Sequence, residues 1–108
     1  MSKLPRSVYD IVVAVVADYD RMSKLLDKGN ITRAQAILYT RYITAVDDAL
    51  VAVCEGEDPA VYSLLRADIA ARNGFENSRS KAYYLTKYSY DRRKSDTIVL
   101  IARILNLV

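Results

Sequence analysis

The sequence contains no histidine and only one cysteine, Cys54. Without histidine, a chain lacks the usual general base of a nucleophilic triad and a frequent ligand of protein-bound zinc. One cysteine cannot form a disulfide within the chain, and Cys54 lies in an apolar stretch with no nearby base to generate a thiolate. We therefore expect a small buried side chain at Cys54, and no metal, disulfide framework or cofactor.

Helix breakers are also scarce, with three glycines and two prolines among 108 residues. All five stand where a helix would begin or end, and no stretch alternates apolar and polar residues as strands do. The length suits one hydrophobic core rather than two. We predict an all-α single domain over 1–108, a bundle of four to five helices. In it, 1–56 form an antiparallel helix pair and 57–108 a basic helical segment.

Long apolar runs are missing as well, since none approaches the roughly 20 residues of a membrane-spanning helix. The basic start of the chain is followed by a short apolar run, Ile11 to Ala17, without a signal-peptide cleavage site. We therefore expect a cytoplasmic protein with no membrane partner.

Candidate acid and base groups are confined to carboxylates that are close neighbours in sequence. They are Asp18 with Asp20, Asp47 with Asp48, and Glu55 with Glu57 and Asp58. Residues one or two apart on a helix do not face each other across a site. No glycine-rich phosphate loop accompanies them. The sequence predicts no enzyme and no small-molecule substrate.

Capping and stop signals divide the first two thirds of the chain into three helices. The first is expected over 7–27 and ends before Gly29, and the second spans 32–56 and begins with a threonine–glutamine capping box. The third is expected over 58–73, with an acid and a proline at its start and Gly74 at its end.

Apolar residues at helical spacing give each of these helices a face to bury. In the first helix they are Val8, Ile11, Val12, Val15, Tyr19, Met22 and Leu26, widened by Val13 and Val16. In the second they are Ala36, Tyr39, Ile43, Val46, Leu50 and Val53. This second series packs along the first helix or dimerises. In the third helix, Val61, Leu65 and Ile69 share a face, with Arg66 and Asp68 pointing to solvent.

The stretch from Ser78 to Val108 joins a basic half to an apolar half. The basic residues are Arg79, Lys81, Lys87, Arg92, Arg93 and Lys94, and the tyrosines among them are Tyr83, Tyr84, Tyr88 and Tyr90. Residues 1–65 carry seven basic and nine acidic side chains, and residues 66–108 carry nine and four. This concentration of positive charge favours an anionic partner, nucleic acid ahead of a membrane surface.

Two helices are expected in this stretch. Ser78 or Ser80 caps a short one ending near Lys87, and Ser89 caps a final one from about Tyr90 to about Leu105. One face of the final helix carries its apolar anchor: Tyr90, Lys94, Thr97, Ile98, Ile101 and Leu105. This face docks on the first helix or forms an interface with another subunit, for which Ile98, Ile101 and Leu105 are the candidate residues.

A short helix, a turn and a second helix with cations near its start resemble a helix-turn-helix. On this hypothesis the DNA-binding residues are Arg79, Lys81, Lys87, Tyr88, Arg92, Arg93 and Lys94. The alternative is that the charged residues form a solvated face and the tyrosines are half-buried core.

Short motifs near both ends resemble the ArpU/RinA-like family of phage transcriptional regulators. They are Leu4-Pro5-Arg6-Ser7-Val8-Tyr9, Ala17-Asp18-Tyr19-Asp20-Arg21-Met22, and Tyr88-Ser89-Tyr90-Asp91-Arg92-Arg93-Lys94 followed by the apolar residues from Ile98 to Leu107. The resemblance covers about half of the chain. It implies an all-helical protein whose C-terminal segment is like sigma-factor region 4, acting in late phage transcription. Arg92, Arg93 and Lys94 would carry over as DNA contacts.

Two functions therefore follow from the sequence. The first is DNA binding by a phage-type transcription regulator, with a homodimer as a plausible working form. The second is a helical protein–protein interaction module that binds itself or another protein and has no nucleic-acid role.

Overall fold

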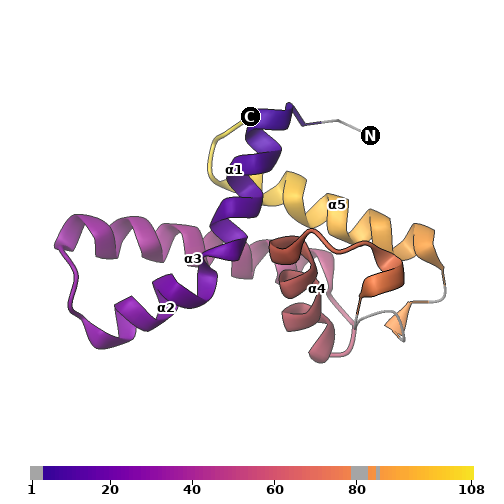
Figure 1. Ribbon diagram of the computed structural model, residues 1–108, viewed down its shortest axis with the longest axis horizontal. Helices are drawn as coiled ribbons and strands as arrows, with labels where there is room; N and C mark the ends of the chain where they lie inside the picture. The colour runs from indigo at the N-terminus through magenta and orange to yellow at the C-terminus, as the bar shows by residue number, and fades with distance from the viewer. Residues whose placement is uncertain (1–3, 79–82, 85) are drawn as a thin grey trace.

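The computed structural model describes residues 4–78, 83–84 and 86–108. Within these ranges all regular secondary structure is helical, which confirms the all-α prediction (Figure 1). The elements are α1 (Arg6–Ala17), α2 (Tyr19–Lys28), α3 (Arg33–Val53), α4 (Ala60–Ala71), the short 3₁₀ helix η1 (Phe75–Asn77) and α5 (Lys87–Ile104).

The predicted first helix is in fact two helices, because the chain bends at Asp18. The N–H of Asp18 still bonds to the carbonyls of Ala14 and Val15, but its carboxylate accepts a hydrogen bond from Arg21 Nε at 2.6 Å. After the bend the two parts find different partners. Helix α1 packs against α4 and α5, whereas α2 packs along α3. The predicted pairing with the second helix therefore applies to α2.

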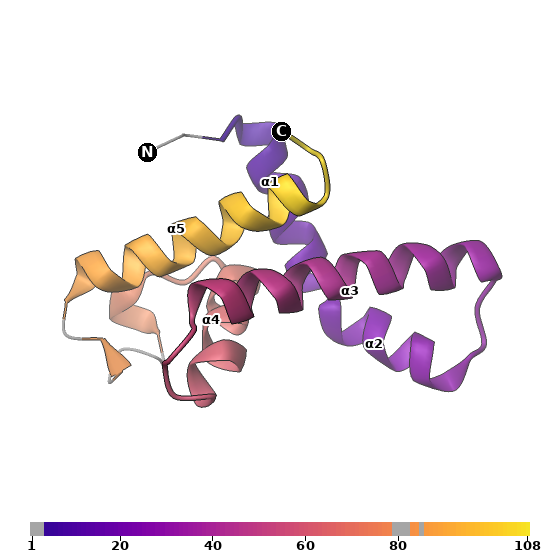
Figure 2. The same cartoon turned by 180° about the vertical axis from the view of Figure 1, so that it is seen from behind.

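Helix α3 begins as its sequence predicts. Thr32 Oγ1 accepts from the N–H of Gln35 at 3.1 Å, and the Gln35 side chain accepts from the N–H of Thr32 at 3.0 Å. Before it, Gly29 closes α2 in the left-handed conformation, at φ +69°. Together α2 and the first half of α3 extend away from the other helices as an arm (Figures 1 and 2).

Helix α4 begins at Ala60, two residues after the predicted start, and ends at Ala71, two residues before the predicted end. Asp58 Oδ1 accepts from the N–H of Ala60 at 2.9 Å, and the left-handed residue that ends the helix is Arg72, at φ +57°, rather than Gly74. The prediction that Asp68 points to solvent is wrong, because this carboxylate is buried and accepts hydrogen bonds from Tyr90 and Ser78.

The basic segment departs most from expectation. Helix α5 begins at Lys87, with Thr86 and not Ser89 as its N-cap. Of the predicted short helix, residues 79–82 and 85 lie outside the described ranges, and the backbones of Ser78 and Thr86 are extended rather than helical. Residues 87–90, where the sequence predicts the turn between the two helices, are instead the first helical residues of α5. The helix-turn-helix prediction is not confirmed.

One hydrophobic core lies where α1, α3, α4 and α5 meet. Val12 and Val16 of α1, Leu50 of α3 and Leu65 of α4 are all buried in it. Helix α5 packs on both α1 and α3, so the predicted docking of the last helix on the first is confirmed. Among the described residues no helix has both the length and the apolar character needed to cross a membrane.

Candidate nucleic-acid interface at the start of helix α5

The first turns of α5 are fixed by Tyr90, whose side chain is completely buried. Its hydroxyl donates to Asp68 Oδ2 at 3.0 Å and to the carbonyl of Asn73 at 3.3 Å. The rings of Phe75 and Tyr84 pack around it at centroid distances of 5.5 and 5.6 Å. This anchor determines which α5 side chains face solvent.

Three of the predicted DNA-binding residues, Lys87, Tyr88 and Arg92, project from the solvent side of this helix. Tyr88 is 70% exposed, and the side chains of Lys87 and Arg92 are 67% and 64% exposed. Each cation lies near an acid one turn later, Lys87 near Asp91 and Arg92 near Asp96. Such exposed pairs contribute between zero and about 1 kcal/mol, so a ligand can displace them at low cost.

Arg93 points toward the C-terminal end of α3 instead. Its Nε lies 3.2 Å from Glu57 Oε1, and a terminal nitrogen donates to the carbonyl of Val53, the last residue of α3. The last carbonyls of a helix lack intrahelical partners and carry partial negative charge, so a guanidinium there is stabilising. Arg93 therefore joins α5 to α3.

Lys94 lies on the buried face, as its spacing from Tyr90 predicts. Its Nζ donates to the carbonyl of Asn73 at 2.6 Å, and burial lowers the pKa of this amine. A cation already held against a backbone carbonyl is poorly placed for a phosphate. Of the remaining predicted contacts, Arg79 and Lys81 lie outside the described residues.

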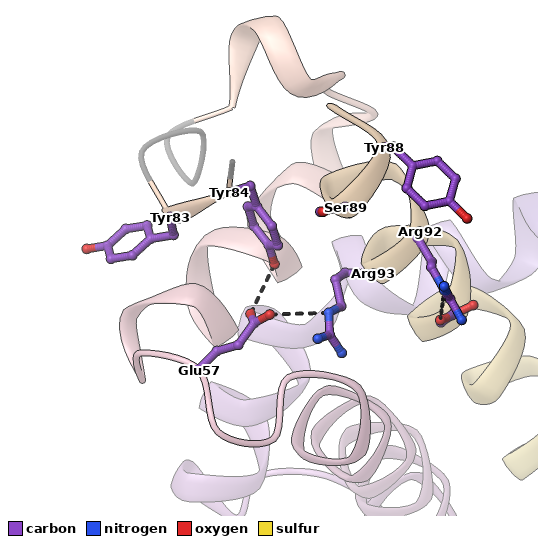
Figure 3. Close-up of a pocket in the computed structure, with 8 residues that line it drawn as sticks. Glu57, Tyr83, Tyr84, Tyr88, Ser89, Arg92 and Arg93 are labelled. Atoms are coloured by element: carbon purple, nitrogen blue, oxygen red, sulfur yellow. Dashed lines mark hydrogen bonds and ion pairs between the residues drawn. The ribbon is translucent and has the colours of Figure 1, made fainter. Parts of the chain in front are cut away.

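An open pocket of about 470 Å³ borders the exposed face of α5 (Figure 3). Its lining residues come from the start of α5, the loop after α3 and the tyrosine pair before α5: Glu57, Tyr83, Tyr84, Tyr88, Ser89, Arg92, Arg93 and Asp96. The volume lies within the range of small-ligand pockets, roughly 300–1,000 Å³.

The polar floor of the pocket is a hydrogen-bonded triad. Tyr84 donates from its hydroxyl to Glu57 Oε2 at 3.2 Å, while Arg93 holds the other carboxylate oxygen (Figure 3). Burial, reinforced by the charge of Glu57, raises the pKa of Tyr84 well above its usual value. Its hydroxyl therefore remains protonated, and thus a donor to Glu57, throughout the physiological pH range. The triad holds an acceptor and donors at fixed positions on one side of the pocket, and Tyr88 and Arg92 line the other side (Figure 3).

Charges on this surface are balanced among the described residues. Lys87, Arg92 and Arg93 stand against Asp91 and Asp96 of the same helix and against Glu57. Residues 66–108 contain more basic than acidic side chains, but the described face of α5 has no such excess. The face presents aromatic and hydrogen-bonding groups together with balanced charges.

The predicted interface residues lie inside the molecule. Ile98, Ile101 and Leu105 are 4%, 0% and 6% exposed and belong to the chain's own core. Cys54 is also fully buried, as expected, and burial raises the pKa of its thiol to about 11. No group of three or more possible metal ligands lies within the described part of the chain.

Five of the eight lining residues are not among the predicted DNA contacts: Glu57, Tyr83, Tyr84, Ser89 and Asp96. Glu57 comes from the loop after α3, some thirty residues before α5. Tyr84 and Asp96 line the pocket with it only in the folded chain. The cluster of tyrosines among cations was the available signal for Tyr84. Comparison with family models, with curated proteins and with solved structures finds no match of any of the three kinds.

Proposed function

We propose that this chain binds nucleic acid through the exposed face at the start of α5, with Lys87, Tyr88 and Arg92 as contacts. The observation that carries the proposal is the exposure of these three side chains on a helix anchored by buried Tyr90, with Tyr88 and Arg92 lining an open pocket. Cations contact phosphates, and exposed tyrosines stack on bases. The resemblance to ArpU/RinA-like phage regulators supports DNA as the nucleic acid and transcription control as its purpose.

Among the described residues the contact set is narrower than the sequence predicts. Arg93 and Lys94 are held by backbone carbonyls and serve the fold. Lys87, Tyr88 and Arg92 have no such commitment beyond exposed pairs with acids on the same helix. We assign DNA contact to these three residues and do not invoke a helix-turn-helix.

Fluorescence anisotropy with labelled DNA at 50 and 200 mM salt tests the proposal. If two phosphates are contacted, a fourfold rise in salt lowers the affinity about tenfold, because binding releases counterions from the DNA and this release is less favourable at higher salt. Lys87→Ala combined with Arg92→Ala should weaken binding at 50 mM salt by about tenfold. An acidic polymer serves as competitor, because a merely electrostatic surface binds it equally well.

Arg33→Ala is the matched control for these variants. Arg33 is exposed at the first position of α3, a helix of 21 residues and so about 30 Å long, with the pocket beyond its other end. Its replacement should leave the affinity unchanged. Equal losses in the control and in the double variant, or no binding at 50 mM salt, would refute the proposal.

A second candidate function, protein–protein interaction, is favoured by apolar exposure on the arm. Ile37 and Leu38 of α3 are 63% and 41% exposed. Replacing both with serine should abolish a concentration-dependent oligomer in sedimentation velocity if the arm associates. Replacing Ile101 would not test this function, because Ile101 belongs to the core.

A further inference from the structure

The pocket at the start of α5 joins an exposed aromatic ring to a rigid polar floor. Tyr88 lines it at 70% exposure on the side of Arg92, and the Tyr84–Glu57–Arg93 triad lines its other side (Figure 3). Tyrosine rings with this exposure do not stabilise the core. A planar ligand could stack on Tyr88, with the Arg92 guanidinium on the same side of the helix (Figure 3).

We infer that this pocket takes one unpaired base of a single strand, so that the chain prefers single-stranded to duplex nucleic acid. The inference rests on the nucleic-acid binding proposed above and names its ligand. Every base offers a face that stacks on an aromatic ring, and donors and acceptors on its edge. In a duplex these faces are covered by neighbouring base pairs, so Tyr88 has nothing to stack on except at a helix end.

The balance of charges supports the same ligand. Duplex DNA places one negative charge about every 1.7 Å along its axis, counting both strands. Asp91, Asp96 and Glu57 would stand close to such a dense row of phosphates and repel it. A single strand carries fewer charges per unit length, and it can bring one phosphate to Arg92 while directing its bases away from the acids.

Binding of a short mixed-sequence single strand and of the corresponding duplex to the full chain at 50 mM salt tests the inference. We expect the single strand to bind at least about tenfold more tightly. Tyr88→Ala should weaken single-strand binding by about tenfold or more, within the range for loss of one stacked base, while Tyr88→Phe keeps the ring and the affinity. A 2-aminopurine base in the strand should lose fluorescence on binding to wild type, but not to Tyr88→Ala.

The outcomes separate this inference from the proposal on which it rests. If duplex and single strand bind equally, and Tyr88→Ala changes nothing while Arg92→Ala weakens both, nucleic-acid binding stands and the base pocket is overturned. If neither DNA binds at 50 mM salt, both are overturned. Circular dichroism of Tyr88→Ala must match wild type, as expected for an exposed side chain.

Discussion

Arg92 and Arg93 are adjacent in the chain, but they leave helix α5 in different directions and have different roles. Arg92 is solvent-facing, with its Nε 3.9 Å from Asp96, whereas Arg93 contacts both Glu57 and the end of α3. Successive side chains on a helix differ by about 100° in direction, which lets Arg92 face solvent while Arg93 turns toward the end of α3. Arg92 is available to a ligand, whereas Arg93 stabilises the contact between α5 and α3, so the two arginines are not one DNA-binding unit.

Stability measurements on the single variants should separate the two arginines. Arg93→Ala should lower the free energy of unfolding by about 1–2 kcal/mol, because it removes charge-assisted bonds to a carbonyl and a carboxylate. Arg92→Ala should stay within about 0.5 kcal/mol of wild type, as exposed substitutions usually do. Urea titration followed by circular dichroism measures both. Equal effects would mean that the Arg93 contacts contribute nothing.

The residue scale also shows how far the sequence can specify a site. Lys94 recurs with Tyr90, Thr97 and Ile101 at helical spacing, so the sequence already placed it on the buried face. Its selection as a DNA contact ignored that pattern. For Arg93 no pattern was available, because its partner Glu57 is distant in sequence and comes close only when α3 packs on α5.

Among the elements, boundaries set by local hydrogen bonds were predicted well. The capping box of Thr32 and Gln35 and the left-handed Gly29 depend on residues within four positions of each other. The bend at Asp18 was missed because no glycine or proline marks it. It separates a helix that packs on α4 and α5 from one that packs on α3, and such partners are set by tertiary structure.

The start of α5 was predicted three residues late because Thr86 and Ser89 can each cap a helix. In the structure Thr86 Oγ1 accepts from the N–H of Ser89 at 3.1 Å, which makes Ser89 the third helical residue. The earlier start adds a turn containing Lys87 and Tyr88. Both proposed contacts therefore depend on Thr86 for their helical geometry.

Thr86→Ala should fray this first turn. Loss of an N-cap costs about 1 kcal/mol, so we expect that decrease in the free energy of unfolding and a weaker affinity for nucleic acid. Ser89→Ala is the control for stability, because it keeps the backbone N–H that donates to Thr86 Oγ1, and it should cost a few tenths of a kcal/mol; the affinity is not compared, because Ser89 lines the pocket. Thr86→Ser keeps a capping hydroxyl, so the free energy of unfolding and the affinity should both stay close to those of the wild type. A larger loss with Ser89→Ala would reassign the cap to Ser89.

On the scale of the whole molecule, hydrogen bonds between side chains and to backbone carbonyls join the helices both inside the core and at its edge. Tyr19 of α2 donates to Asp47 of α3 at 2.7 Å, and Tyr90 of α5 donates to Asp68 of α4. Arg41 of α3 donates to the carbonyl of Leu105 at the end of α5, at 3.2 Å. These bonds link elements far apart in sequence, so they couple the arm and the α5 surface to one folding unit.

The buried hydroxyl and thiol groups predict that the protein loses stability at alkaline pH. Burial, with the hydrogen bond to Asp47, raises the pKa of Tyr19 to about 12, and burial also raises the pKa values of Tyr84, Tyr90 and the Cys54 thiol. From about pH 9 upward the unfolded chain therefore releases protons that the folded chain retains, and the free energy of unfolding falls with pH.

Burial of Lys94 acts in the opposite direction. Its pKa is lowered in the folded state, so the unfolded chain keeps this proton longer and stability rises with pH in the range where the two differ. One group opposes four, so we expect the urea midpoint to fall steadily between pH 9 and pH 12. Tyr19→Phe should make the fall shallower, because it removes one of the four groups while keeping the ring. A midpoint that stays constant or rises over this range would show that the hydroxyls and the thiol ionise as readily in the fold as in the unfolded chain.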